Sequence, residues 1–120
     1  PGIQNENLLQ MHTFPCENGD EFPKNQYTKW FDYDKIKGTL SLRHRQPGDY
    51  LTLPSGGRKT LKSWMIDEKI PRQEREQIWL LAEEKHILWI VGHRISAYYK
   101  ITEQTKTILE VEFNGGKSSG

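Results

Sequence analysis

Short segments that are apolar or that alternate apolar with polar residues recur along this 120-residue chain, and turn-forming residues separate them. They predict strands at residues 9–13, 27–33, 40–43, 50–53, 78–81, 87–91 and 108–113. No internal repeat and no regular alternation of strands with helices is present, which disfavours an open parallel sheet. We therefore expect an α+β fold, a β-rich sandwich-like domain of six or seven short strands with one or two short helices.

One segment has a helical rather than a strand-like pattern. After Thr60, an expected N-cap, the residues Leu61, Trp64 and Met65 share one face. Pro71 predicts the first position of a second short helical turn. Three tryptophans lie on apolar faces, and we expect them in the core rather than as platforms for nucleobases: Trp64, Trp79 and Trp89.

The chain divides into three parts by composition. Residues 1–26 form a turn-rich lead-in with one expected strand, residues 27–113 form the domain, and residues 114–120 form a tail that we expect to be disordered. Because the first residue is Pro1 and no signal sequence follows it, we expect a piece of a longer chain. The apolar run at residues 87–91 is far too short to span a membrane.

The charge is distributed unevenly, although the net charge is only +1. Residues 35–75 contain ten basic and four acidic side chains, whereas residues 1–34 contain two basic and six acidic ones. A basic cluster of this kind is typical of a phosphate-binding surface. It is also found on the solvated face of many proteins that bind no nucleic acid.

Several classes of site lack their sequence signatures. The single cysteine, Cys16, excludes an internal disulfide and a cysteine-based zinc site, and it favours a reducing intracellular setting. Neither a phosphate-binding glycine loop nor a nucleophile elbow is present. The four histidines have no metal-ligand spacing, and we expect them at the surface: His12, His44, His86 and His93. We therefore expect no catalytic residue and no metal site.

Four segments in order resemble a known family. They are LRHRQPGDY at 42–50, GGRKTLK at 56–62, DEKIPRQER at 67–75 and LWIVGHRI at 88–95. Together they resemble the C-terminal domain of tRNA(Ile)-lysidine synthetase, with a match that extends over about residues 27–113. The resemblance implies a sandwich-like fold related to a domain in the beta subunit of phenylalanyl-tRNA synthetase.

The resemblance also implies a function. In that family the domain helps to hold the acceptor stem of tRNA(Ile) with a CAU anticodon. The N-terminal catalytic domain of the same chain uses ATP, with magnesium, and lysine to convert the wobble cytidine to lysidine in the cytoplasm. The SGG-x-DS loop of that catalytic domain is absent here, so we expect no catalysis and no cofactor in this piece. An alternative is a module that packs against other domains of the enzyme without contacting RNA.

Nine basic residues are our candidates for RNA contact. Lys59 and Lys62 are expected on one side of the predicted helix with Arg58, while Arg43 and Arg45 are expected to share a strand face. For Arg43, an internal ion pair with Asp49 is expected as strongly as a contact with RNA. The full set is Arg43, Arg45, Arg58, Lys59, Lys62, Lys69, Arg72, Arg75 and Arg94.

Overall fold

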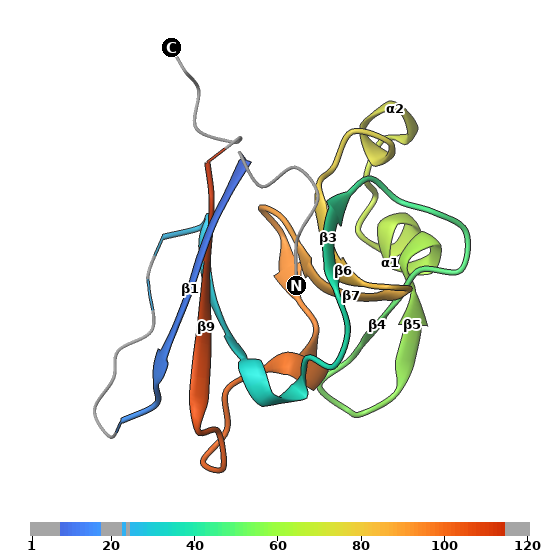
Figure 1. The fold of residues 1–120 in the computed structure, drawn as a ribbon. Helices are drawn as coiled ribbons and strands as arrows, with labels where there is room; N and C mark the ends of the chain where they lie inside the picture. The colour runs from blue at the N-terminus through green and yellow to red at the C-terminus, as the bar shows by residue number, and fades with distance from the viewer. Residues whose placement is uncertain (1–7, 18–22, 24, 115–120) are drawn as a thin grey trace.

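The computed structural model describes residues 8–17, 23 and 25–114, and these residues form two sheets with short helices (Figure 1). The smaller sheet has the order β1-β9-β2, with β1 at Leu9–Pro15, β9 at Thr107–Phe113 and β2 at Thr28–Asp32. Both outer strands pair antiparallel with β9. The N-terminal strand expected at residues 9–13 is thus an integral part of this sheet.

The larger sheet has the order β3-β6-β7-β4-β5, and β8 pairs with β7 outside this path. Its strands are β3 (Leu40–Arg43), β4 (Tyr50–Thr52), β5 (Arg58–Thr60), β6 (Leu80–Glu83), β7 (His86–Ile90) and β8 (Arg94–Ile95). The turn expected at residues 46–49 is confirmed by the hydrogen bond from the Asp49 amide to the Gln46 carbonyl at 3.3 Å. The two strands that flank it, β3 and β4, do not pair with each other, because β6 and β7 lie between them.

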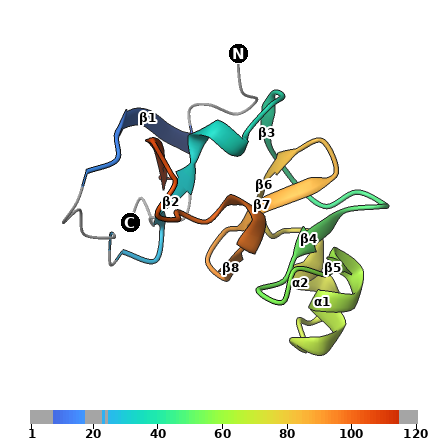
Figure 2. The same cartoon turned by 90° about the horizontal axis from the view of Figure 1, so that it is seen from below.

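The helices are short. They are α1 (Leu61–Asp67), α2 (Arg72–Arg75) and the 3-10 turns η2 (Tyr33–Lys35) and η3 (Ala97–Tyr99). The hydroxyl of Thr60 accepts a hydrogen bond from the Ser63 amide at 3.1 Å, which confirms Thr60 as the N-cap of α1. Figure 2 shows α1, α2 and β5 gathered at one end of the molecule. Among the described residues, no helix is long and apolar enough to cross a membrane.

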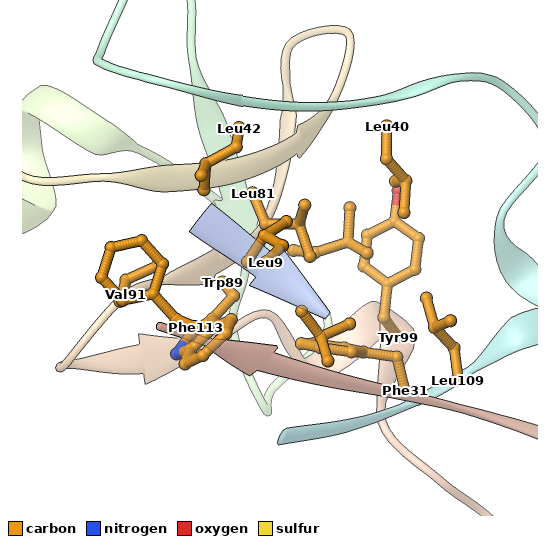
Figure 3. Close-up of a cluster of buried hydrophobic side chains, with 12 residues drawn as sticks. Leu9, Phe31, Leu40, Leu42, Leu81, Trp89, Val91, Tyr99, Leu109 and Phe113 are labelled. Carbon is orange, nitrogen blue, oxygen red and sulfur yellow. The ribbon is translucent and has the colours of Figure 1, made fainter. Parts of the chain in front are cut away.

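Two apolar clusters lie on opposite faces of the larger sheet. The first fills the space between the sheets, where Phe31 of β2 contacts Trp89 of β7 with ring centroids 6.4 Å apart (Figure 3). The second packs Trp64 and Met65 of α1 against the sheet. Side chains on both faces of β6 and β7 are therefore buried, which explains why the sequences of these strands are continuous apolar runs rather than alternating segments.

The fold class expected from the sequence, a small α+β sandwich, is confirmed, and each of the seven predicted strands has a counterpart. The described residues contain nine strands rather than six or seven, because β5 and β8 are only three and two residues long. Two details at the ends of the predicted elements are wrong. Pro71 is the N-cap of α2 rather than its first residue, and Asp32 ends β2 and caps η2 within the segment expected as one strand.

Two of the three tryptophans expected in the core, Trp64 and Trp89, are buried. Trp79 is half-buried at the edge of the first cluster, where its ring stacks on His44 with centroids 4.1 Å apart.

Candidate nucleic-acid interface

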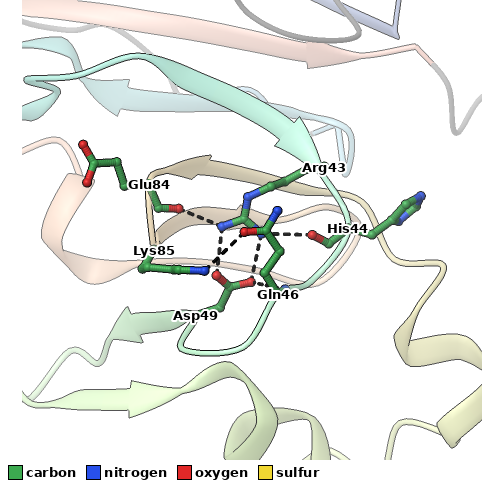
Figure 4. Close-up of polar contacts among 6 residues, drawn as sticks. All are labelled: Arg43, His44, Gln46, Asp49, Glu84 and Lys85. Carbon is green, nitrogen blue, oxygen red and sulfur yellow. Dashed lines mark hydrogen bonds and ion pairs between the residues drawn. The ribbon is translucent and has the colours of Figure 1, made fainter.

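The loop between β3 and β4 is held by a buried ion pair at its base (Figure 4). The guanidinium of Arg43 donates to both carboxylate oxygens of Asp49, at 2.8 and 2.9 Å, and also to the carbonyl oxygens of His44 and Glu84. The side chains of Arg43 and Asp49 are only 13% and 1% exposed. Asp49 also accepts a hydrogen bond from the Gln46 amide at 2.8 Å. The internal pairing weighed for Arg43 is confirmed, and it fixes the shape of the loop.

Arg45 extends from this loop toward the helices. Its Nε donates to a carboxylate oxygen of Glu76 at 2.6 Å, which links the loop to the end of α2. Because β3 ends at Arg43, Arg45 lies outside the strand, and the expectation that the two arginines share a strand face is wrong. Arg45 and Lys62 line one hollow of about 570 Å³, so the fold brings these two candidates together.

Two candidates expected on the helix belong to a strand instead. Arg58 and Lys59 lie in β5, which pairs antiparallel with β4 before α1 begins at Leu61. The Lys59 ammonium forms an ion pair with Asp67 at the end of α1. The exposed Arg58 guanidinium lies 4.3 Å from the ring centroid of Tyr50. The prediction that Lys59 and Lys62 project from one helix face is therefore wrong, because RKT has no apolar alternation to reveal its strand.

Most of the remaining candidates lie at the surface of α1, α2 and their connection, which together we call the helical layer. Lys62 is on α1, Lys69 follows α1 with a φ of 58°, and Arg72 begins α2. Arg75 donates from Nε to the Ile70 carbonyl at 2.8 Å, which closes the connection between the helices. Within residues 8–17, 23 and 25–114, five candidates are exposed and have no ion-pair partner: Arg58, Lys62, Lys69, Arg72 and Arg94.

A second hollow, of about 660 Å³, lies beside the first and combines aromatic with basic side chains. We call it the aromatic groove. The groove adjoins the loop between β3 and β4, because the Lys85 ammonium donates to the side-chain carbonyl of Gln46 at 3.2 Å. The side chains that define it are Lys35, Lys37, Tyr50, Thr52, Arg58, Glu83, Glu84, Lys85, His86, Tyr98 and Tyr99.

His86 lies at the centre of this groove. Burial lowers the pKa of the imidazole from its ordinary value of 6.5, and the nearby charge of Arg58 lowers it further, against an opposing effect of Glu83. Its Nε2 is within hydrogen-bond distance of the hydroxyls of Thr52, at 3.0 Å, and Ser96, at 3.3 Å. The expectation of a plain surface histidine is wrong for His86, since it is half-buried among aromatic rings.

The carboxylate of Glu83 is part of the groove's wall. It accepts hydrogen bonds from the backbone amides of Lys37, at 2.6 Å, and Gly38, and from the Tyr99 hydroxyl at 2.7 Å. Burial and this hydrogen bond raise the pKa of Tyr99. Glu83 is thus occupied in holding the chain at residues 37–38.

Sequence reasoning did not identify the aromatic groove. Its members are separated by up to tens of residues, and no pattern within a strand or helix relates Tyr50 to His86 or Tyr98. The one local signal is the alternation in β4, which places Tyr50 and Thr52 on one face. Among the described residues there is no group of three or more His, Cys, Asp or Glu side chains placed to hold a metal ion.

Comparison with known proteins gives one consistent relationship. Residues 40–112 match the family described as the TilS substrate C-terminal domain. A tRNA(Ile)-lysidine synthase from Caldanaerobacter subterraneus subsp. tengcongensis is 46% identical over 95 residues, which are 78% of this chain and 20% of that protein. A tRNA(Ile)-lysidine synthase from Clostridium tetani is 41% identical over 101 residues, which are 83% of this chain and 22% of that protein.

The structural comparison agrees with the sequence comparison. A crystal structure described as the TILS C-terminal domain superposes with a TM-score of 0.63 and 27% identity, and the match covers 89% of this chain and 85% of that one. The chain spans about a fifth of the length of the curated relatives, so it corresponds to one region of those proteins. The match to the family, the relatives and the shared fold together show that this chain belongs to the TilS substrate C-terminal domain family.

Proposed function

We propose that this domain binds tRNA on behalf of a tRNA(Ile)-lysidine synthase and holds the acceptor stem while another part of the enzyme modifies the anticodon. The observation that carries the proposal is the set of cations on the helical layer. Lys62, Lys69 and Arg72 are exposed, and in the described part of the chain no carboxylate pairs with them. These cations remain available to neutralise phosphates.

The chemistry of an RNA stem suits such a surface. Double-helical RNA is contacted mainly through its phosphates and 2′-hydroxyls, because its deep major groove admits few side chains. Each phosphate neutralised by Lys or Arg releases bound counterions, which makes the affinity depend strongly on salt. Arg45 extends the basic surface to the loop between β3 and β4, although Glu76 neutralises part of its charge.

The other components of the reaction belong, in this proposal, to the full-length enzyme. ATP with magnesium and lysine bind the N-terminal catalytic domain, and the substrate is tRNA(Ile) with a CAU anticodon in the cytoplasm. The role of the present domain is to position the substrate. Support comes from the relatives named tRNA(Ile)-lysidine synthase, of which this chain matches about a fifth.

One alternative also has an observation in its favour. Arg43, Arg45 and Lys59 all pair with carboxylates within the domain. In addition, Ile66 on α1 is 51% exposed and could pack against a neighbouring domain. A domain that serves only for packing would bind tRNA weakly and without strong salt dependence.

Titration of labelled tRNA(Ile) with the 120-residue chain at about 50 and about 200 mM salt separates these functions. We expect binding that weakens steeply with salt, and we expect Lys62→Glu combined with Arg72→Glu to lower the affinity at least about tenfold. The double variant should also reduce the salt slope by about two, since two phosphate contacts are lost.

The matched control is Lys100→Glu combined with Lys106→Glu, which reverses two exposed charges away from the helical layer. This variant has the same net charge as the first, so it should bind nearly as well as the original chain if the surface is specific. Circular dichroism confirms that each variant is folded. Salt-insensitive binding, or no binding by the folded chain, would favour the packing function.

A further inference from the structure

We infer that the aromatic groove is a binding site for an unpaired nucleotide of RNA, with Tyr98 stacking on the base and Lys35 and Lys37 contacting its phosphates. The inference rests on the proposed RNA-binding function and assigns it a second contact, chemically distinct from the cations of the helical layer. An RNA stem presents its phosphates to α1 and α2, whereas the groove accepts a nucleotide that lies outside the RNA double helix.

The groove contains a connected cluster of aromatic rings with a cation at each end. The ring of Tyr50 lies between the guanidinium of Arg58, at 4.3 Å, and the imidazole of His86, at 4.6 Å. The other neighbours of His86 are the rings of Tyr98, at 5.2 Å, and Tyr99, at 4.8 Å. The ammonium of Lys35 lies 5.0 Å from the centroid of Tyr98. Three separate parts of the chain thus build one π surface that opens to solvent at Tyr98.

The two rings that contact Tyr98, those of His86 and Tyr99, are held by hydrogen bonds. Thr52 and Ser96 position the imidazole of His86 through their hydroxyls, and Tyr99 is anchored by its hydrogen bond to Glu83. Burial and the charge of Arg58 lower the pKa of His86, which favours the neutral form of its ring. The cations at the two ends of the ring cluster are Arg58 and Lys35. Tyr98 is the exposed member, with 43% of its surface accessible.

Phosphate contacts are available at the rim. Lys35 and Lys37 belong to one short segment whose backbone Glu83 holds in place. Lys35 has a long flexible side chain, so it can leave the face of Tyr98 when a base arrives and pair with the neighbouring phosphate. Two carboxylates line the groove and must be avoided by a phosphate. Glu84 lies on the β6–β7 turn, and the Glu83 carboxylate accepts hydrogen bonds from the Lys37 and Gly38 amides and the Tyr99 hydroxyl.

The chemistry selects an unpaired nucleotide rather than a helix. In a duplex each base is covered on both faces by its neighbours, so an aromatic side chain finds no free face to stack on. Single-stranded nucleic acid is bound by aromatic platforms combined with cations, and one stacked base contributes about 1–3 kcal/mol. The groove offers this combination, which a stem-binding surface does not need.

The test uses two labelled RNA hairpins of the same stem, one blunt and one with a four-nucleotide single-stranded 3′ extension. We expect the 120-residue chain to bind the extended hairpin more tightly. Tyr98→Leu should weaken that complex by about fivefold or more, the lower limit for one lost stack, and should change the blunt complex by less than about twofold. Lys35→Glu should have the same selectivity and provides a second variant that leaves the ring cluster intact.

Tyr33→Leu is the matched control, because Tyr33 is 41% exposed on η2 and does not line the groove. Equal binding of both hairpins, with no selective effect of Tyr98→Leu, overturns the inference and leaves the proposed function standing. Failure of the folded chain to bind either hairpin overturns both. An equal loss in Tyr98→Leu and Tyr33→Leu also overturns the inference, since the effect would not be specific to the groove.

Discussion

Arg43 and Arg45 are two residues apart in one sequence motif, and the structure gives them different environments. The Arg43 guanidinium is enclosed and satisfied by four hydrogen bonds, whereas Arg45 pairs with Glu76 near solvent. Removing one partner of a buried pair leaves an uncompensated charge, which costs far more than losing an exposed pair. The motif therefore includes one residue that serves folding and one that reaches the candidate interface.

We predict that Asp49→Ala lowers the free energy of unfolding by about 3–5 kcal/mol, because Arg43 loses its buried partner. Glu76→Ala should cost less than about 1 kcal/mol, since the Glu76 side chain is 62% exposed. Urea denaturation of both variants measures the difference. Similar losses in the two variants would show that the buried pair stabilises the domain no more than the exposed pair does.

The β4–β5 hairpin is the element on which the sequence prediction and the structure differ most. It turns at residues 53–57, where the Leu53 amide donates to the Gly57 carbonyl and the Gly56 amide donates to the Leu53 carbonyl, both at 2.8 Å. Gly56 has a φ of +100°, which L side chains rarely adopt, while Gly57 has no positive φ. Because of this hairpin, Arg58 and Lys59 lie in β5 rather than on α1, and Arg58 lies against the ring of Tyr50.

Two alanine substitutions test this hairpin. Gly56→Ala should destabilise the domain by about 1–2 kcal/mol through backbone strain. Gly57→Ala should be neutral or slightly stabilising, because an added Cβ meets no heavy atom within 4 Å at either glycine and only the φ differs. Thermal unfolding followed by circular dichroism compares the two. A larger loss for Gly57→Ala would contradict this account of the turn.

At the scale of the whole molecule, the two sheets share one apolar core. Phe31 on the smaller sheet and Trp89 on the larger one are both fully buried in it. The larger sheet also carries α1 on its other face through the second cluster. The candidate interface on α1 and α2 is thus connected through one sheet to the core that both sheets form.

We predict that Phe31→Ala lowers the free energy of unfolding by about 3–5 kcal/mol, as large-to-small changes of buried aromatic residues do. Unfolding should remain a single transition, with coincident curves from far-ultraviolet circular dichroism and tryptophan fluorescence. Ile66→Ala, at a side chain that is 51% exposed, is the control and should change stability by less than about 0.5 kcal/mol. Separate transitions would show that the smaller sheet unfolds alone.

Local patterns in the sequence determined most of the elements and the family. Alternation and apolar runs indicated seven strands, Thr60 indicated the start of α1, and the six-residue spacing of Arg43 and Asp49 was compatible with their pairing. The four ordered motifs indicated the family that the comparisons show. These features were accessible because each depends on neighbours within one element or one loop.

The tertiary structure alone decided which strands pair, which cations stay free and which rings meet. β3 and β4 are consecutive strands, yet β6 and β7 separate them, because strands buried on both faces take the centre of the sheet. The aromatic groove joins Lys35, Arg58, His86 and Tyr98 from four elements. Such contacts between distant segments depend on how whole elements pack, and periodicity within a segment contains no information about them.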